Sequence, residues 1–245
     1  MATLLLRLAA PMQSWGTASK YETRDTGREP SKSGVVGLLA AALGRCRDAD
    51  LTDLNELSFG VRVDQEGVLL HDYQIAWVNG EKNPNVTHRY YLSDAVFLVG
   101  LESPDCAFLE KLDYALRHPV FPLFLGRRSC PPSVPLTLGI RDKTLLPALQ
   151  DEDWQAAEWR QAQFRQAVLR KSSQCPVSLR LVTDALPGEA GGGNVRDLPI
   201  TFNPSHRKYG WRRAIHRDNV GKCPIEISVD AVLKTEHDPM TELRG

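Results

Sequence analysis

Hydrophobic and polar positions along the chain predict alternating strands and helices. The run from Thr3 to Leu8 is short and apolar and precedes a turn with proline and glycine, which predicts a first strand. Apolar residues between Val35 and Leu43 are spaced for the buried side of a helix. This helix is expected to begin at Ser31 or Ser33, whose hydroxyls can cap free N–H groups, and to end at Gly44.

The middle of the chain continues this alternation. Leu57 to Val63 and Val68 to His71 are predicted to be short strands, joined as a hairpin by a turn that ends at Gly67. Tyr91 to Leu101 is predicted to be one continuous apolar strand in the middle of a sheet, and Pro104 to Leu116 has the spacing of an amphipathic helix. The order of these elements is a split βαβ pattern of the ferredoxin-like kind, shared with RNA-recognition domains. The usual aromatic RNA-contact signature of those domains is absent.

A polar stretch from Asp72 to Tyr90 interrupts this pattern. It contains Asn-Gly and Asn-Pro pairs, which favour turns, so it is predicted to be an extended arm. Trp77, His88 and Arg89 at its shoulders are residue types that stack on bases and bind phosphates. The same composition is also typical of a surface loop that binds nothing.

The rest of the chain is predicted to be a helix followed by strands. Asp151 to Lys171 begins with acids and ends with bases, as helices do. Cys175 to Thr183 and Ile225 to Leu233 are predicted strands. The predicted class is therefore α+β, with a ferredoxin-like domain over 1–150, a linking helix over 151–173 and a small β-rich domain over 174–245.

Composition narrows the function classes only slightly. The 30 lysines and arginines balance 30 aspartates and glutamates, so net charge indicates neither a nucleic acid nor a membrane partner. The longest apolar run, Val35 to Leu43, is far shorter than the roughly 20 residues that a membrane span needs. The five cysteines are scattered without a CxxC pair, which disfavours a disulfide framework or a zinc site and fits a reducing cytoplasm.

One candidate anion site lies at the start of the first predicted helix. Ser31, Lys32 and Ser33 stand at its N-terminus, where free N–H groups and the helix dipole favour an anion such as phosphate. Arg24 flanks this site, and Trp15 is a candidate for stacking on a base. The alternatives are an ordinary capped core helix and a tryptophan that packs in the core, the more common role for such a residue.

Two further stretches are basic and rich in turns. Gly126, Arg127 and Arg128 combine a residue that permits close backbone approach with side chains suited to phosphate. Between Phe202 and Arg213, aromatic and basic residues alternate, including Arg207 and Lys208. This composition is typical of nucleic-acid binding. A charged hairpin in solvent explains it about equally well.

Four motifs in order resemble a known family. They are LRLAAPMQSWG, REPSKSGVVGLLAAALG, RYYLSDAVFLVGL and HPVFPLFLGRRSCPPS. Together they make the chain similar to the CasD family, the RAMP-type subunits of the type I-E CRISPR surveillance complex, Cascade. The resemblance is good from Leu6 to about Pro135 and continues only in the strand around Asn203 to Arg213. The helix predicted from Asp151 to Lys171 has no counterpart that we can map.

The resemblance implies a fold, a role and partners. It implies a modified RNA-recognition fold with an inserted β-hairpin thumb at about 72–90, in a cytoplasmic protein without cofactor, metal or membrane contact. It further implies a non-catalytic subunit that grips the 5′ handle of the CRISPR RNA, contacts the backbone and large subunits of Cascade, and meets target DNA through the complex. The residues that match handle-facing motif positions are Arg24, Ser31, Lys32, Ser33, Gly126, Arg127 and Arg128.

Two other function classes remain open. Some relatives in another subtype are metal-independent endoribonucleases that process CRISPR RNA precursors. Here His118 would be the acid or base, with Lys32 or Arg127 stabilising the developing charge. This hypothesis is disfavoured because His118-Pro119 opens an apolar segment, where a packed histidine is more common. The third class is a protein scaffold that never contacts RNA.

Overall fold

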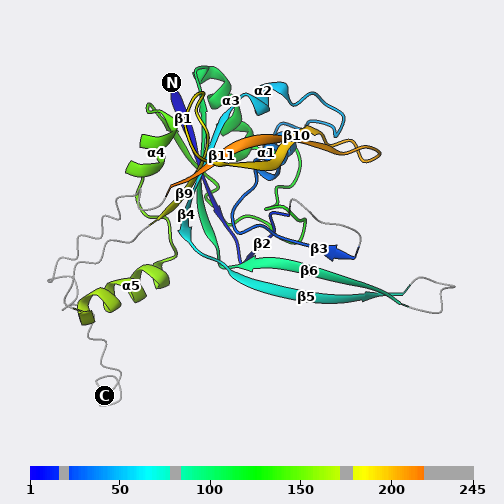
Figure 1. The fold of residues 1–245 in the computed structure, drawn as a ribbon, viewed down its shortest axis with the longest axis horizontal. Helices are drawn as coiled ribbons and strands as arrows, with labels where there is room; N and C mark the ends of the chain where they lie inside the picture. Colours follow the sequence, from blue (N-terminus) through cyan, green and yellow to red (C-terminus); the bar gives the residue numbers. More distant parts are fainter. Residues whose placement is uncertain (17–21, 78–83, 172–178, 218–245) are drawn as a thin grey trace, which may run out of the picture.

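A seven-stranded antiparallel sheet with helices on both faces forms the body of the protein (Figure 1). The computed structural model describes residues 1–16, 22–77, 84–171 and 179–217. The strands are β1 (Ala2–Ala9), β2 (Met12–Gln13), β3 (Thr23–Arg24), β4 (Ser58–Gln65), β5 (Val68–Ala76), β6 (Asn85–Ser93), β7 (Val96–Ser103), β8 (Thr137–Arg141), β9 (Arg180–Asp184), β10 (Gly193–Thr201) and β11 (Lys208–Arg217). The helices are α1 (Lys32–Ala42), α2 (Thr52–Asn55), α3 (Cys106–Arg117), α4 (Leu145–Asp151) and α5 (Glu158–Lys171). The strand order is β10-β11-β9-β4-β7-β1-β8.

Alternation along β1 divides the core into two layers. Leu4 and Leu6 face the main core beneath α1 and α3, whereas Leu5 between them faces a smaller core beneath α4. Gly60 and Gly100 let α4 approach closely, because a Cβ on either would lie within 2.8 Å of a leucine methyl group of this helix. The sheet is therefore buried on both faces near its centre.

Helix α1 begins as the sequence predicts. Ser31 is the N-cap, and its hydroxyl accepts a hydrogen bond from the Gly34 N–H at 3.2 Å. Gly34 leaves room for the Trp15 ring, since a Cβ there would lie 2.8 Å from Trp15 Cε3. The Trp15 side chain is 1% exposed and donates from Nε1 to Gln13. Trp15 therefore packs in the core, and the alternative of stacking on a base is wrong.

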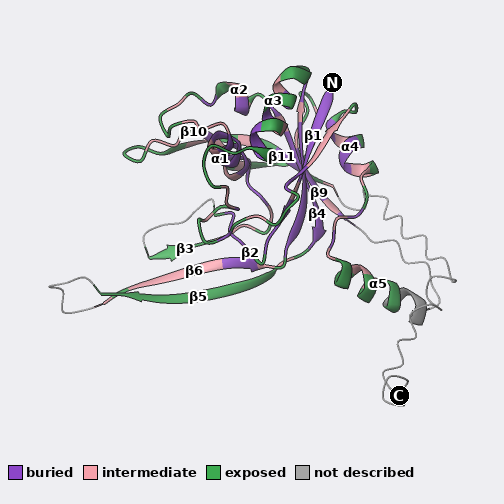
Figure 2. Cartoon of the chain, turned by 180° about the vertical axis from the view of Figure 1, so that it is seen from behind, coloured by how far each residue is buried: buried purple, intermediate pink, exposed green. Residues whose placement is uncertain are grey.

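A long hairpin leaves the main sheet and belongs to a second one. β5 pairs with β6 along its whole length, and β6 also pairs with β2 and β3. The hairpin projects from the body, and β5 is exposed along it (Figure 2). The arm predicted from Asp72 to Tyr90 is thus a β-hairpin that begins four residues earlier, at Val68, and residues 78–83 at its end lie outside the described residues.

Two strand predictions fail at the root of this hairpin. The hairpin predicted around Gly67 does not form, because β4 belongs to the main sheet and β5 to the second. The strand predicted from Tyr91 to Leu101 is two strands, broken at Asp94, whose φ is 55°. Gly67 and Asp94 lie where the chain leaves and re-enters the main sheet, and a Cβ on Gly67 would lie 2.8 Å from Ala95 Cβ.

The strands predicted for a separate C-terminal part extend the main sheet. β9 pairs with β4, with Gly60 opposite Thr183, and β11 and β10 follow outward from β9. The strand predicted from Ile225 to Leu233 lies outside the described residues, as does the start of the strand predicted from Cys175. The described part of the C-terminal region therefore shares its sheet with the N-terminal region.

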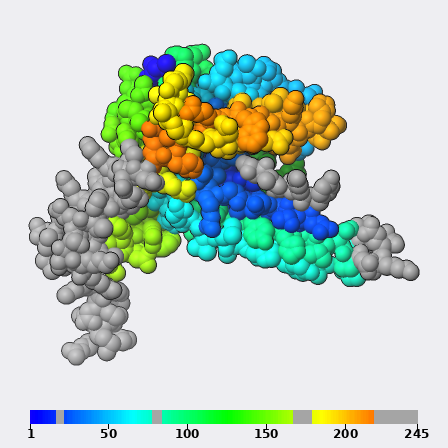
Figure 3. All heavy atoms as spheres, viewed as in Figure 1, coloured from blue at the N-terminus to red at the C-terminus, as the bar shows by residue number. Residues whose placement is uncertain are grey.

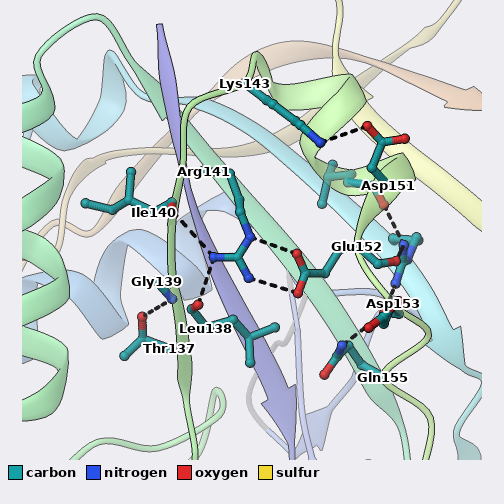
Figure 4. Close-up of polar contacts among 12 residues, drawn as sticks. Thr137, Leu138, Gly139, Ile140, Arg141, Lys143, Asp151, Glu152, Asp153 and Gln155 are labelled. Atoms are coloured by element: carbon teal, nitrogen blue, oxygen red, sulfur yellow. Dashed lines mark hydrogen bonds and ion pairs between the residues drawn. The ribbon is translucent and has the colours of Figure 1, made fainter.

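The helix predicted from Asp151 to Lys171 begins only at Glu158, because a buried ion pair holds the preceding segment extended. Arg62 and Asp64 are both fully buried and joined at 2.7 Å, Nε to Oδ1, and 2.8 Å, Nη2 to Oδ2. The remaining guanidinium N–H groups donate to the carbonyls of Leu149, Glu152 and Asp153 at 2.5–2.7 Å. Those carbonyls are consequently unavailable to a continuous helix. Figure 4 shows this segment, where Arg141 also forks onto the Glu152 carboxylate.

We expect Arg62→Met to lower the free energy of unfolding by about 3–5 kcal/mol, because it leaves the Asp64 carboxylate buried without a cation. Arg117→Met is the control. It breaks a pair with Asp113 in which the arginine side chain is 50% exposed, so its effect is expected to be far smaller. Urea titration of both variants measures the difference, and equal losses would contradict the role given to Arg62.

Candidate nucleic-acid interface

Three segments far apart in sequence bring arginines together at the root of the hairpin. β3 pairs parallel with β6, which sets Arg24 opposite Arg89. Arg127, from the loop after α3, donates from Nη2 to the Arg24 carbonyl at 2.7 Å. Its guanidinium carbon lies 4.6 Å from the centre of the Tyr91 ring on β6. We call this group the hairpin-root cluster. It consists of Arg24, Arg89, Arg127 and the adjacent, exposed Arg128.

The hairpin-root cluster gathers four positive charges, with the Asp72 carboxylate of β5 in register opposite Arg89. None of its four guanidinium groups forms an ion pair with a residue that the structure describes. Two of its buried N–H groups, Arg89 Nε and Arg127 Nη1, have no hydrogen-bond partner among the described residues. An unsatisfied buried donor costs about 1–3 kcal/mol. Such a cluster is suited to bind an anion.

The pKa of Tyr91 shows the effect of the positive charge around it. Its side chain is nearly buried, and burial alone would raise its pKa. Hydrogen bonds involving Ser129 and Arg127, together with the positive charge of Arg127, outweigh burial and hold the pKa of Tyr91 below its usual value. Tyr91 was not among the residues predicted for the site, because it stands in an apolar run that indicates only a strand.

Gly126 sets the position of the two arginines that follow it. Its φ is +84°, and a Cβ there would lie 1.6 Å from the Ser14 carbonyl oxygen, so only glycine fits. Ser14 in turn donates to the Leu125 carbonyl at 3.2 Å. The close approach expected of this glycine is therefore made to the chain's own backbone, and it fixes the Arg127-Arg128 turn beside the hairpin.

The start of α1 is occupied by the protein itself. The Lys32 N–H donates to Asp197 Oδ2 at 2.8 Å, and the Lys32 ammonium donates to the Leu57 carbonyl at 2.9 Å and to Asp184 at 3.0 Å. Arg212 bridges the same two carboxylates. The anion that the sequence predicts at this helix end is thus supplied from β9 and β10.

Ser31, Lys32 and Ser33 are all buried in this network and do not join the hairpin-root cluster. The Ser31 hydroxyl is occupied as the helix cap and lies 3.3 Å from that of Ser33. RNA contacts by these three residues stay a prediction, and they would require the network around Asp184 and Asp197 to open.

The hairpin presents two chemically different faces. His71 lies opposite Tyr90 and Tyr73 opposite His88, which places these four rings on one face. The His71 ring stacks on those of Tyr90 and His88, with centroids 4.8 and 5.1 Å away. Arg89 and Tyr91 belong to the other face, because side chains alternate along β6.

The arm residues predicted for RNA therefore do not form one group. His88 lies on the aromatic face and Arg89 on the face of the hairpin-root cluster. Trp77 follows the end of β5 and is 70% exposed. Arg207 and Lys208 lie elsewhere, at the turn between β10 and β11, where both are exposed.

His118 is on the surface at the C-terminal end of α3. Its Nδ1 lies 3.1 Å from the Tyr114 carbonyl oxygen, and the two rings are 4.4 Å apart. A packed histidine was expected here; His118 is instead exposed, with its ring against that of Tyr114. Lys32 and Arg127, its suggested partners in cleavage, are bonded to other groups.

The described residues contain no group of three or more His, Cys, Asp or Glu side chains that could hold a metal ion. None of the helices in this part of the chain is long and apolar enough to cross a membrane.

Comparisons with known proteins agree on one family. Residues 3–215 match the family model described as "CRISPR-associated protein (Cas_Cas5)". The "CRISPR system Cascade subunit CasD" of Escherichia coli (strain K12) is 39% identical over 160 residues, covering 56% of this chain and 70% of the relative.

Two solved structures are also similar. A chain of a "CRISPR RNA-guided surveillance complex" superposes with a TM-score of 0.70 at 29% identity, covering 90% of this chain and 91% of that one. A second, "Crystal structure of Cas protein", has a TM-score of 0.67 at 39% identity over 91% and 99% of the two chains.

We expect Lys32→Met to lower the free energy of unfolding by about 1–3 kcal/mol, because the Leu57 carbonyl and Asp184 lose a buried donor. Lys111→Met, at an exposed position on α3, is the control and should leave stability unchanged. Thermal unfolding measures both. A Lys32→Met chain as stable as the parent that had lost RNA affinity would show instead that this ammonium faces RNA.

Proposed function

Because the chain belongs to the CRISPR-associated protein family (Cas_Cas5), we propose that it is a non-catalytic Cascade subunit that binds the 5′ handle of the CRISPR RNA. The observation that carries the proposal is the hairpin-root cluster, where four guanidinium groups lack a described carboxylate partner. Phosphates of the RNA backbone supply the missing negative charge, and Arg is the side chain best suited to them.

The neighbourhood of the hairpin-root cluster supports RNA as the ligand. Contacts to phosphate position a nucleic acid, whereas recognition of single-stranded RNA relies on bases that stack on aromatic rings. The hairpin offers such rings on its other face, at His71, Tyr73, His88 and Tyr90. It can therefore hold phosphates on one side while unstacked bases lie against the other.

The strand order supports a ferredoxin-like body for this subunit. Within the main sheet β4-β7-β1-β8 are neighbours, with α1 between β1 and β4 in sequence and α3 between β7 and β8. This is the arrangement of a split βαβ unit in which β7 lies between the strands joined by α1. The hairpin β5–β6 is then the insertion that serves as the thumb.

The proposed partners follow from the same assignment. Other Cascade subunits, both backbone and large, are expected to contact this chain, and target DNA is met through the assembled complex. Cytoplasmic location and the absence of a cofactor or membrane contact stay predictions. Cys46, Cys106 and Cys130 are free thiols, which is compatible with a reducing compartment.

We expect Arg128→Ala to weaken binding of handle RNA and to lower the slope of log affinity against log salt by about 0.7, the value for one phosphate contact to a single strand. Arg127→Ala should act in the same direction, although it also removes the bond to the Arg24 carbonyl. Filter binding at several salt concentrations measures the slope.

Arg47→Ala is the matched control for Arg128→Ala. Arg47 is exposed between α1 and α2, outside the hairpin-root cluster. Its replacement removes the same charge and should leave the slope unchanged. If Arg47→Ala and Arg128→Ala shift it equally, binding depends on net charge and the hairpin-root cluster is not the site.

Precursor RNA incubated with the wild-type chain is expected to remain intact, so that His118→Ala removes no activity. His118 is exposed, but neither suggested cation is placed beside it by a described contact. Gel analysis of labelled precursor tests this. Cleavage products that disappear with His118→Ala would establish the endoribonuclease alternative.

A further inference from the structure

The ribbon formed by β10 and β11 has a face that the hairpin-root cluster does not use. Arg212 and Ala214 of β11 point toward α1 and the core, with Arg212 donating to Asp197 at 2.6 Å. Trp211 and Arg213 alternate with them and belong to the opposite face. The ribbon lies in front of α1 in Figure 1, and no described element covers it in the space-filling view of Figure 3.

Trp211 is the centre of this face. Its side chain is 64% exposed, an unusual environment for a tryptophan, and it lines a surface hollow with Asn194, Arg212 and Arg213. The pairing of β10 with β11 is irregular between Val195 and Leu198, so two residues, Arg196 and Asp197, stand opposite Trp211. Asp197 is buried and Arg196 is exposed.

The charge around Trp211 is positive and largely uncompensated. The Arg196 side chain has no ion pair or hydrogen bond among the described residues, and the same is true of the Arg207 side chain at the turn of the ribbon. Arg213 donates to the backbone carbonyls of Glu189 and Gly191, and its charge also acts on the Glu189 carboxylate. The Glu189 carboxylate is paired with Arg217.

We propose that this face is a second binding site for single-stranded nucleic acid, separate from the hairpin-root cluster. Trp211 stacks on a base, Arg196 and Arg213 contact the phosphates on either side of it, and Arg207 at the turn of the ribbon extends the path. A single exposed aromatic ring among free cations is the chemistry of a stacking platform in an electropositive groove. Trp and Arg are also enriched in protein interfaces, so the cations without a carboxylate partner beside the ring are what favours a polyanion as the ligand.

The site does not depend on the proposed handle binding, because it belongs to other strands in another sheet. Both RNA and DNA offer base faces and phosphates, and nothing in the site reads a 2′-hydroxyl or a base edge. Its ligand is therefore defined as a single strand of either kind, without sequence preference.

The test compares Trp211→Ala with Trp159→Ala in the full chain, using oligouridine and oligothymidine as probes. Trp159 on α5 is 58% exposed and serves as the matched control. Loss of one stacked base should weaken binding about 5- to 150-fold, and Trp211→Phe should restore part of it. Arg196→Ala should lower the salt slope by about 0.7.

The same variants separate this site from the hairpin-root cluster. In the Trp211→Ala background, Arg128→Ala should still lower the salt slope for handle RNA by the same amount. In the Arg128→Ala background, Trp211→Ala should still weaken binding of oligouridine by the same factor. Binding of one probe only would identify the source as RNA or DNA. Equal affinities of the Trp211→Ala and Trp159→Ala chains for both probes would overturn the proposal. A Trp211→Ala chain that binds both probes normally but fails to join reconstituted Cascade would overturn it too, because the face would then bind protein.

Discussion

Two carboxylates hold the two halves of the molecule together: Asp197, which is buried, and Asp184, which is partly exposed. Asp197 lies at the positive end of α1, and Asp184 accepts from the Lys32 ammonium and from the Phe59 N–H. Arg212 joins the two carboxylates, and its pKa is raised above the ordinary value because their charges outweigh the effect of burial. Buried charges are stable only when every one is paired, so α1, β4, β9, β10 and β11 must be assembled as a unit.

This constraint explains why the sheet has seven strands and where its free surfaces lie. Pairing of β9 with β4 extends the sheet beyond the four strands β4, β7, β1 and β8. The ribbon β10–β11 is then anchored on one face by Arg212, which leaves the other face, with Trp211, open to solvent. The network therefore removes Lys32 from the surface and at the same time presents a different basic surface.

A second constraint acts at the root of the hairpin. The chain leaves the main sheet near Gly67 and returns at Asp94, and Gly126 lies so close to Ser14 that no side chain fits between them. These contacts hold β6, β3 and the Arg127 loop against one another. A neutral chain thus gathers cations locally, because several carboxylates, among them Asp64, Asp184 and Asp197, are engaged in internal pairs, while the arginines of the hairpin-root cluster form no ion pair with a described residue.

The sequence determined the local elements and much of the chemistry. Residue type and spacing act over a few residues, and they gave the Ser31 helix cap, the hairpin between Asp72 and Tyr90, and the glycine required at position 126. Only the tertiary structure decided which cations face solvent. Lys32 and Arg128 both stand in basic stretches that the sequence predicts to bind phosphate, but Lys32 is buried against Asp184, whereas Arg128 is exposed. Contacts between distant segments, such as Arg62 with the carbonyls after α4, likewise decided several other features. These are the breaks at Gly67 and Asp94, the late start of α5 and the burial of Trp15. Those contacts depend on strand pairing across the sheet, and hydrophobic periodicity carries no information about which strands pair.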